Sequence, residues 1–210
     1  MAWKADPPEA VVFDAFGTLI TAVPGKDGAY QTLARDVAAE PIDFRRSALT
    51  CPASLHEFAF SLGASDPAKY QRMLESELEG CTLYDDVRDT LAFLRATGVR
   101  YAVCSNLASG YGGKVRELVP GAEAYVFSYE TGLVKPESGI YGACCEALGL
   151  PPEKIAFIGD TPSMDFQGPT AAGMRAALVT RKAGDGLLAA ISRLPRTPTA
   201  PASLPGHGAS

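Results

Sequence analysis

Short runs of consecutive apolar residues, each closed by a polar cluster, recur along this chain. The first run is Val11-Val12-Phe13, which follows two prolines and ends at Asp14 and a Gly-Thr turn. A run that is apolar at every position is typical of a parallel strand buried on both faces. Similar runs predict further strands at residues 99–104, 124–127, 155–158 and 176–179.

Helical patterns separate these strands. They cover residues 86–97, which end at Gly98, then residues 138–148 and a segment near residues 165–172. Because helices alternate with strands, the pattern predicts an α/β fold in which helices flank a doubly wound parallel sheet.

The segment between the first strand and residue 84 has helical runs and no strong strand pattern. Ser54 and Glu57 form a capping-box pattern, and Asp66-Pro67 is typical of a helix start. We therefore expect a small helical insertion over residues 22–81 and a main domain formed by residues 1–21 and 82–194. The four helical runs of the insertion are residues 29–39, 43–49, 54–62 and 67–78.

The end of the chain, residues 195–210, has a different composition. It is rich in Pro, Ala, Ser, Thr and Gly. Such a segment buries too little apolar surface to offset its ordering entropy, so we expect a disordered tail.

Composition narrows the class of protein. The 210 residues are 47% hydrophobic and 20% charged, with a net charge of -5, which argues against nucleic acid and anionic membranes as partners. No run approaches the roughly 18 apolar residues of a membrane span, and Asp6 to Glu9 interrupt any signal sequence. The five cysteines form no C-x-x-C pair, so we expect a cytoplasmic protein that acts on a small molecule.

Polar clusters follow the predicted strands. Because the carboxyl ends of parallel strands meet at one edge of a sheet, these clusters should lie together. They offer a carboxylate nucleophile, a hydroxyl and amides for an anion, a lysine, and paired acids able to hold Mg²⁺. The clusters are Asp14, Ser105-Asn106, Lys135-Pro136, and Gly159-Asp160 with Asp165.

In this order the clusters resemble the four motifs of the haloacid dehalogenase (HAD) superfamily of hydrolases. The resemblance covers nearly the whole chain except the tail. It implies a Rossmann-like core and a helical cap that closes over the site and chooses a small anionic substrate. Its catalytic residues would be Asp14 as nucleophile and Lys135, which steadies both the carboxylate and the anion. The transferring group would be held by Ser105, the amide of Asn106 and Thr18.

The same resemblance implies a Mg²⁺ cofactor. Its ligands would be Asp14, the backbone carbonyl of Phe16, Asp160 and Asp165. Phe16 departs from the phosphatase pattern, in which a second aspartate at this position protonates the leaving oxygen. In the 2-haloacid dehalogenases of the superfamily an aromatic residue is usual there, because halide leaves without a proton.

Two interpretations of the activity therefore compete, a phosphatase and a dehalogenase, and a third interpretation belongs to another class of protein. Tyr141 and Arg45 or Arg46 fall near positions that dehalogenases use, although a tyrosine can equally be packing and an arginine solvated. Against a metal-free dehalogenase stands Asp160, since each like-charge contact at about 4 Å costs roughly 4 kcal/mol at an effective dielectric near 20. We therefore expect a Mg²⁺-dependent hydrolase of a small phosphorylated metabolite, with 2-haloacid dehalogenation or a non-catalytic binding protein as the alternatives.

Overall fold

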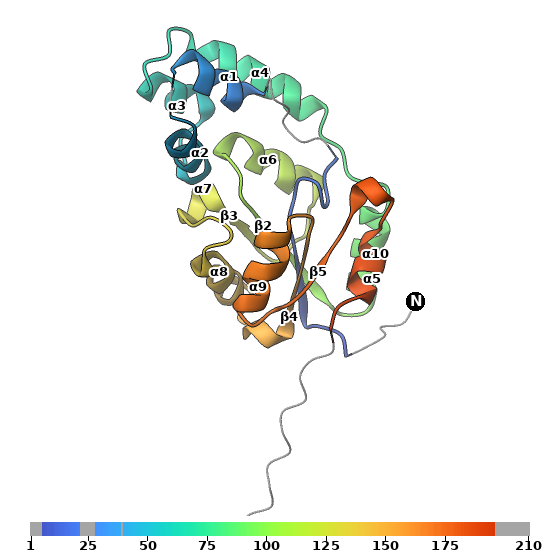
Figure 1. The fold of residues 1–210 in the computed structure, drawn as a ribbon. Helices are drawn as coiled ribbons and strands as arrows, with labels where there is room; N and C mark the ends of the chain where they lie inside the picture. Colours follow the sequence, from blue (N-terminus) through green and yellow to red (C-terminus); the bar gives the residue numbers. More distant parts are fainter. Residues whose placement is uncertain (1–5, 22–27, 39, 196–210) are drawn as a thin grey trace, which may run out of the picture.

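The protein has a Rossmann-like α/β fold, as the alternating pattern predicts. The computed structural model describes residues 6–21, 28–38 and 40–195. Five parallel strands pair in the order β3-β2-β1-β4-β5 (Figure 1). Their bounds are β1 Ala10–Phe13, β2 Arg100–Ser105, β3 Tyr125–Phe127, β4 Ile155–Gly159 and β5 Arg175–Leu178.

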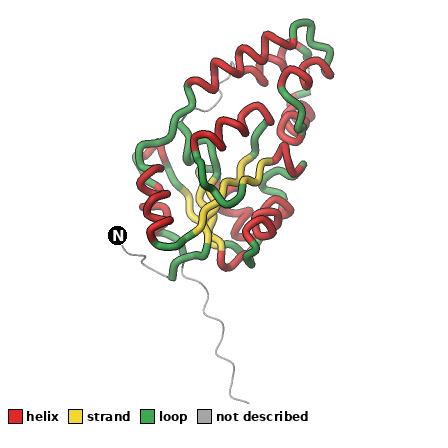
Figure 2. Tube along the Cα trace, turned by 180° about the vertical axis from the view of Figure 1, so that it is seen from behind, coloured by secondary structure: helices red, strands yellow, loops and turns green. Residues whose placement is uncertain are grey.

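Helices cover both faces of this sheet (Figure 2). Successive strand residues point to opposite faces, so Val11 and Phe13 join one core cluster while Val12 joins the other. The first cluster includes residues of α5 (Val87–Ala96), α6 (Ser109–Leu118) and α10 (Leu187–Ser192). The second includes residues of α8 (Ser138–Leu148), and α9 (Gly168–Ala171) packs against α8.

A four-helix segment, α1–α4, lies beyond the carboxyl ends of the strands (Figure 1). Its helices are α1 Ala29–Asp36, α2 Pro41–Thr50, α3 Leu55–Ser61 and α4 Pro67–Glu79. The capping box is confirmed, because Ser54 accepts a hydrogen bond from the Glu57 amide and Glu57 accepts one from the Ser54 amide. Asp66 likewise caps α4 ahead of Pro67.

The chain enters and leaves the four-helix segment through neighbouring strands of backbone. Ile20 forms an isolated bridge with Leu83. One residue further on, the Thr21 amide donates to the Thr82 carbonyl at 2.8 Å, and the two hydroxyls lie 2.8 Å apart. Both connections therefore leave the sheet at one point.

Helix α6 was not predicted, and its glycines explain why. Gly110, Gly112 and Gly113 lower helix propensity. A methyl group at Gly112 would overlap the hydroxyl of Tyr129, and one at Gly110 would overlap Leu74 of α4. Close packing thus requires the residues that hide the helix from a sequence pattern.

Other short elements were also missed or displaced. The segment predicted near residues 165–172 begins earlier, as a π-helix at Pro162–Gln167 that continues into α9. Helices α7 (Ser128–Thr131) and α10 and the 3-10 turns Pro152–Lys154 and Arg181–Ala183 have six residues or fewer, too few for a clear period.

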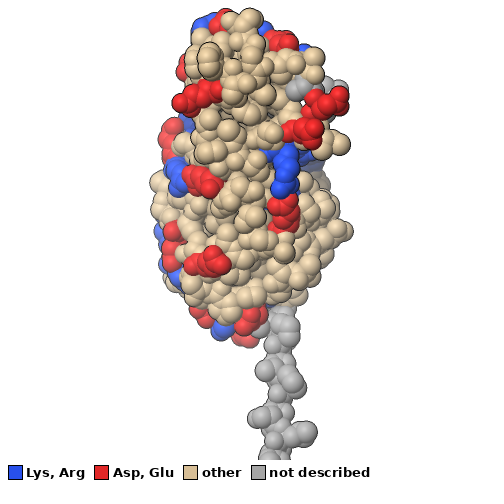
Figure 3. Space-filling view, turned by 90° about the vertical axis from the view of Figure 1, so that its left-hand side faces the viewer, with Lys and Arg blue, Asp and Glu red and all other residues tan. Residues whose placement is uncertain are grey.

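The surface view adds to the charge analysis. On the face shown in Figure 3, acidic and basic side chains are interspersed among neutral ones, with no broad patch of one sign. Within the described parts of the chain, no helix has the length and apolar character needed to cross a membrane. The predicted tail lies, apart from Pro195, outside the described residues.

Candidate active site

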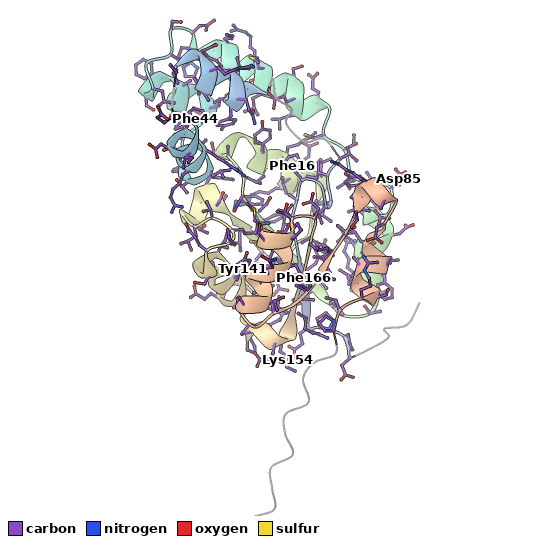
Figure 4. All side chains as sticks on the ribbon, in the orientation of Figure 1. Phe16, Phe44, Asp85, Tyr141, Lys154 and Phe166 are labelled. Carbon is purple, nitrogen blue, oxygen red and sulfur yellow. The ribbon has the colours of Figure 1, made fainter. Side chains whose placement is uncertain are left out.

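The parallel register brings the predicted polar clusters to one edge of the sheet. Asp14 follows β1, Ser105 ends β2, and Asp160 follows β4, with β1 paired to both neighbours. The Asp14 amide donates to the Ile158 carbonyl at 2.9 Å, which continues the ladder to the site. In Figure 4, Phe16 marks this end of the sheet and Lys154 the opposite end.

A buried lysine joins two of the carboxylates. Lys135 Nζ lies 2.7 Å from Asp14 Oδ1 and 2.6 Å from Asp165 Oδ1, and only 2% of its side chain is exposed. Burial alone would lower the pKa of Lys135, but the charges of Asp14 and Asp165 outweigh it and raise that pKa above its ordinary value. Lys135 is therefore a fixed positive charge beside Asp14.

The backbone of Lys135 is held as firmly as its side chain. Asn106 accepts from the Lys135 amide at 2.8 Å and donates to the Lys135 carbonyl at 2.9 Å. The ammonium group also lies 5.3 Å from the centre of the Phe157 ring. Two predicted site residues, Asn106 and Lys135, thus form one unit, which includes the cis peptide bond to Pro136.

Three carboxylates converge near the lysine. Asp14, Asp160 and Asp165 each offer an oxygen, and these oxygens lie within 4.8 Å of one another. Burial and repulsion by Asp14 raise the pKa of Asp165 to about 6, although Lys135 opposes the shift. The same two causes raise the pKa of Asp160. Three acids beside one lysine leave negative charge that a cation would neutralise.

Two glycines allow this convergence. Gly17 has φ +81°, and a methyl group there would overlap the carboxylate of Asp160. A methyl group at Gly159 would overlap Asp165 in the same way. Asp165 is held in this place by the Thr161 amide, which donates to its Oδ2 at 2.9 Å.

The predicted ligands of the anion take different places. Ser105 Oγ donates to Asp14 Oδ1 at 2.8 Å. Thr18 is fully buried, and its hydroxyl has no hydrogen-bond partner among the described residues.

Aromatic rings continue from the loop after Asp14 into the four-helix segment. Phe16 is half-buried and meets Tyr111 of α6 edge-on, with ring centres 5.7 Å apart. Tyr111 is followed by Tyr30 at 5.9 Å, and Tyr30 by Phe58 at 6.4 Å. Phe58 packs on Phe44, which Figure 4 places within the four-helix segment.

Comparison with known proteins gives the family of this site. The sequence model of the haloacid dehalogenase-like hydrolases matches residues 8–173. This chain belongs to that family. The match takes in the four motif clusters and the four-helix segment, so the predicted HAD resemblance is confirmed.

Relatives of this HAD hydrolase include phosphatases. The phosphoglycolate phosphatase of Rhodospirillum rubrum is 30% identical over an alignment 188 residues long, which covers 80% of this chain and 77% of that protein. The phosphoserine phosphatase of Thermus thermophilus is 32% identical over 47% of this chain, which covers only 41% of that protein. A solved HAD phosphatase from Thermococcus onnurineus is 25% identical, with a TM-score of 0.60 over 85% of this chain and 89% of that one. Solved 2-haloacid dehalogenases share the fold at 19 to 22% identity.

The residues that a HAD dehalogenase would share take structural places here. Tyr141 is fully buried on α8, and its hydroxyl donates to the Met164 carbonyl at 2.6 Å. Arg45 and Arg46 are exposed on α2, and Arg46 pairs with Glu137 at 2.6 Å. Packing explains the tyrosine, and a surface ion pair explains Arg46.

Two residues that were not predicted, Tyr111 and Glu77, extend the aromatic contact of Phe16. The Tyr111 hydroxyl donates to Glu77 Oε2 at 2.7 Å, and Glu77 also accepts from the Ala29 amide at the start of α1. Burial, followed by the hydrogen bond to Glu77, raises the pKa of Tyr111 well above its ordinary value. Tyr111 lies on the helix that its glycines concealed, so the sequence offered no signal for it.

Proposed function

We propose that this HAD hydrolase is a Mg²⁺-dependent phosphatase that uses Asp14 as its nucleophile on a small phosphorylated metabolite. The observation that carries the proposal is the convergence of three carboxylates, two of which contact one buried lysine. Phosphatases among the relatives, one of them aligned over 80% of this chain, support the same reaction class.

The acidic cluster fits a hard cation. Mg²⁺ prefers oxygen ligands, and Asp14, Asp160 and Asp165 supply carboxylates whose oxygens lie within 4.8 Å of one another. We assign the Phe16 carbonyl to the same ion. Bound there, Mg²⁺ would neutralise the acids and draw a phosphate towards Asp14.

Asp14 would form the covalent bond. Ser105 and Lys135 both donate to its Oδ1, so we assign attack to Oδ2. The Oδ2–P bond forms as the ester P–O bond breaks, and the leaving oxygen departs with the electron pair. Water then attacks phosphorus and gives up a proton to the solvent, from which the departed alkoxide takes one up. The Asp14–P bond breaks, which releases phosphate and regenerates the free carboxylate.

Other residues of the edge would hold the phosphoryl group. We assign this role to Ser105, the Asn106 amide and Thr18, with Lys135 neutralising charge on the equatorial oxygens. Because Asn106 brackets the Lys135 backbone, displacement of either residue would move the other.

Phe16 restricts the leaving group. Its ring faces Tyr111, whose hydroxyl is already donated to Glu77. With an apolar side chain at this position, we assign the enzyme leaving groups that need little protonation. General acid catalysis typically contributes about 100- to 10,000-fold, so its loss weakens turnover without abolishing it.

The four-helix segment would act as a cap. We propose residues 22–81 as this cap and residues 1–21 with 82–194 as the catalytic core. The connections at Thr21 and Thr82 lie side by side, which suits a hinge.

The five free cysteines are consistent with a reducing cytoplasm.

One observation favours a second candidate, a 2-haloacid dehalogenase. Phe16 would suit halide departure, but Asp160 and Asp165 would repel a substrate carboxylate unless a cation were bound. A third possibility, a protein that binds anions without turnover, would also need no general acid.

A product assay separates these functions. The full chain would be incubated with acetyl phosphate, p-nitrophenyl phosphate or 2-chloropropionate, in Mg²⁺ or in excess chelator, with Asp14→Asn as control. We expect phosphate release that needs both Mg²⁺ and Asp14. Chloride release in chelator would establish the dehalogenase instead, and phosphate binding without either product would establish the binding protein.

A further inference from the structure

An arginine that follows the edge strand of the sheet binds the loop that carries Asp14. Arg181 follows β5, and only 9% of its side chain is exposed. Its Nη2 and Nε donate to the Thr18 carbonyl at 2.6 and 3.0 Å. The two donors converge on a single oxygen, which fixes the Thr18 peptide in direction as well as distance.

The arginine is itself held from several sides. Its Nη1 lies 2.8 Å from Asp86 Oδ1, and its guanidinium group stacks on Tyr84, 4.2 Å from the ring centre. The other oxygen of Asp86 accepts from the Leu187 amide at the start of α10 at 2.6 Å. The position of Arg181 is thus set by α5, α10 and the loop before α5.

The position of the Thr18 peptide affects the geometry of the acidic cluster. The loop closes on itself, since the Leu19 and Ile20 amides both donate to the Ala15 carbonyl, at 2.8 and 3.0 Å. Gly17, next to Thr18, lies so close to Asp160 that no side chain fits between them. Rotation of the Thr18 peptide would therefore change the spacing between Asp14 and Asp160.

The same loop is joined to both connections to the four-helix segment. The Tyr84 amide donates to the Leu19 carbonyl at 3.0 Å, one residue beyond Thr18. Any movement of the segment about Thr21 and Thr82 would pull on residues 19 and 20 first. Arg181 anchors the loop between this hinge point and Asp14.

We propose that Arg181 is a positioning residue, which holds the nucleophile loop at the spacing that Mg²⁺ and phosphoryl transfer require while the cap moves. The inference rests on the proposed function, because the spacing it protects is that of Asp14 and Asp160. Asp86 and Tyr84 belong to the same device, since they orient the guanidinium group.

The test replaces the donors and keeps the stem. Arg181→Met removes every hydrogen bond of the guanidinium group, and Arg181→Lys retains the charge with a single donor direction. Arg100→Met is a matched control, because Arg100 also pairs with an acid, Glu123 at 2.7 Å, and donates to a carbonyl, that of Leu148 at 3.1 Å, at the opposite end of the sheet from the acidic cluster. Mg²⁺ affinity by calorimetry, kcat and KM for p-nitrophenyl phosphate, and Tm are measured for each full-length protein.

For Arg181→Met we expect Mg²⁺ affinity and kcat each to fall by about 10- to 100-fold, the usual cost of losing a group that orients metal ligands. KM should change by less than about threefold, Arg181→Lys should recover part of both losses, and Arg100→Met should stay within about twofold of wild type. Equal Mg²⁺ affinity and kcat in Arg181→Met and Arg100→Met would overturn the inference.

A second variant covers the case in which Arg181→Met does not fold. Asp86→Asn keeps the shape and the acceptor for Leu187 but weakens the hold on the guanidinium group, so a smaller loss in the same direction is expected. No change in either quantity would contradict the proposal. A wild-type protein with neither Mg²⁺ binding nor phosphate release would refute the proposed function itself, a result distinct from both.

Discussion

The sheet edge and the four-helix segment are connected through the rings of Phe16 and Tyr111, yet different forces stabilise the two regions. At the edge, Lys135 touches Asp14 and Asp165 within 2.7 Å, and the side chains are almost fully buried. In the four-helix segment, Tyr30, Phe58 and Phe44 pack ring against ring. Charge fixes geometry at the edge because an unpaired buried ion is costly, whereas apolar packing tolerates substitution of similar volume. Chemistry should therefore depend on the edge and substrate choice on the segment.

Removal of the lysine should break the edge most severely. In Lys135→Met, Asp14 and Asp165 lose their common counter-ion, so we expect the unfolding free energy to fall by about 3–5 kcal/mol in chelator. Phosphate release should also fall by more than about 1,000-fold, because the anion loses its nearest positive charge.

Denaturant titration and a phosphate assay measure both effects. Lys154→Met is the control, since Lys154 forms an exposed pair with Glu9 at 3.1 Å and should change stability by less than about 1 kcal/mol. Equal effects of the two variants would show that the edge is not held by charge.

A substitution at Phe16 should change the chemistry of the sheet edge. Phe16→Asp should raise kcat for phosphate esters with poor leaving groups by about 100-fold or more, because a carboxyl group can then protonate the leaving oxygen. Esters with good leaving groups should gain much less. Rates for alkyl and nitrophenyl phosphates give the comparison.

The matched variant is Phe16→Asn, which has the same shape and transfers no proton. A similar gain in Phe16→Asn would mean that space, and not acid catalysis, limits the wild type. If Phe16→Asp shows no gain in kcat, the proposal that the wild type is a phosphatase without a general acid is contradicted.

Stability should depend on pH and Mg²⁺ together. The pKa of Asp165 is raised to about 6 without metal, above its ordinary value of 3.8. The contribution of Asp165 to the stability of the folded protein is therefore complete below about pH 4, where the carboxyl group is protonated, and is lost as pH rises through 6. Mg²⁺ relieves the repulsion between Asp14 and Asp165, and saturating Mg²⁺ should stabilise the protein by about 2 kcal/mol more at pH 7.5 than at pH 4.5.

Thermal unfolding with Mg²⁺ or chelator at the two pH values measures the difference. It should shrink in Asp165→Asn, which does not titrate. A Mg²⁺ effect that is equal at both pH values would contradict a metal site at Asp165.

A change within the four-helix segment should have the smallest effect. Ser54→Ala removes the N-cap of α3 and should cost about 1 kcal/mol of stability, with Mg²⁺ affinity unchanged. Ser192→Ala, whose hydroxyl bonds the Ala189 carbonyl within its own helix, is the control and should cost less. Loss of Mg²⁺ affinity in Ser54→Ala would show that the two regions are more tightly coupled than we describe.

The fold followed from the sequence because its elements carry local signals. The strands are continuous apolar runs, and the caps at Ser54 and Asp66 obey short-range rules. Helix α6 was not predicted because its Gly112 makes room for Tyr129, which lies 17 residues further along the chain. Packing between distant segments overrides propensity there.

The site divides in the same way. Asp14, Lys135, Asp160 and Asp165 could be predicted together because parallel strands deliver their ends to one edge. The pairing of Asn106 with the Lys135 backbone and the grip of Arg181 on Thr18 could not, because neither forms a motif. Both depend on side chains that reach a backbone group far along the chain.

The most direct test of the central claim is Mg²⁺ titration calorimetry on wild type and Asp160→Asn, with and without tungstate as a phosphate mimic. We predict micromolar-to-millimolar binding to the wild type that tungstate strengthens, and loss of that binding in Asp160→Asn. Absence of Mg²⁺ binding in the wild type, or unchanged binding in the variant, would contradict a metal-dependent phosphatase at this edge.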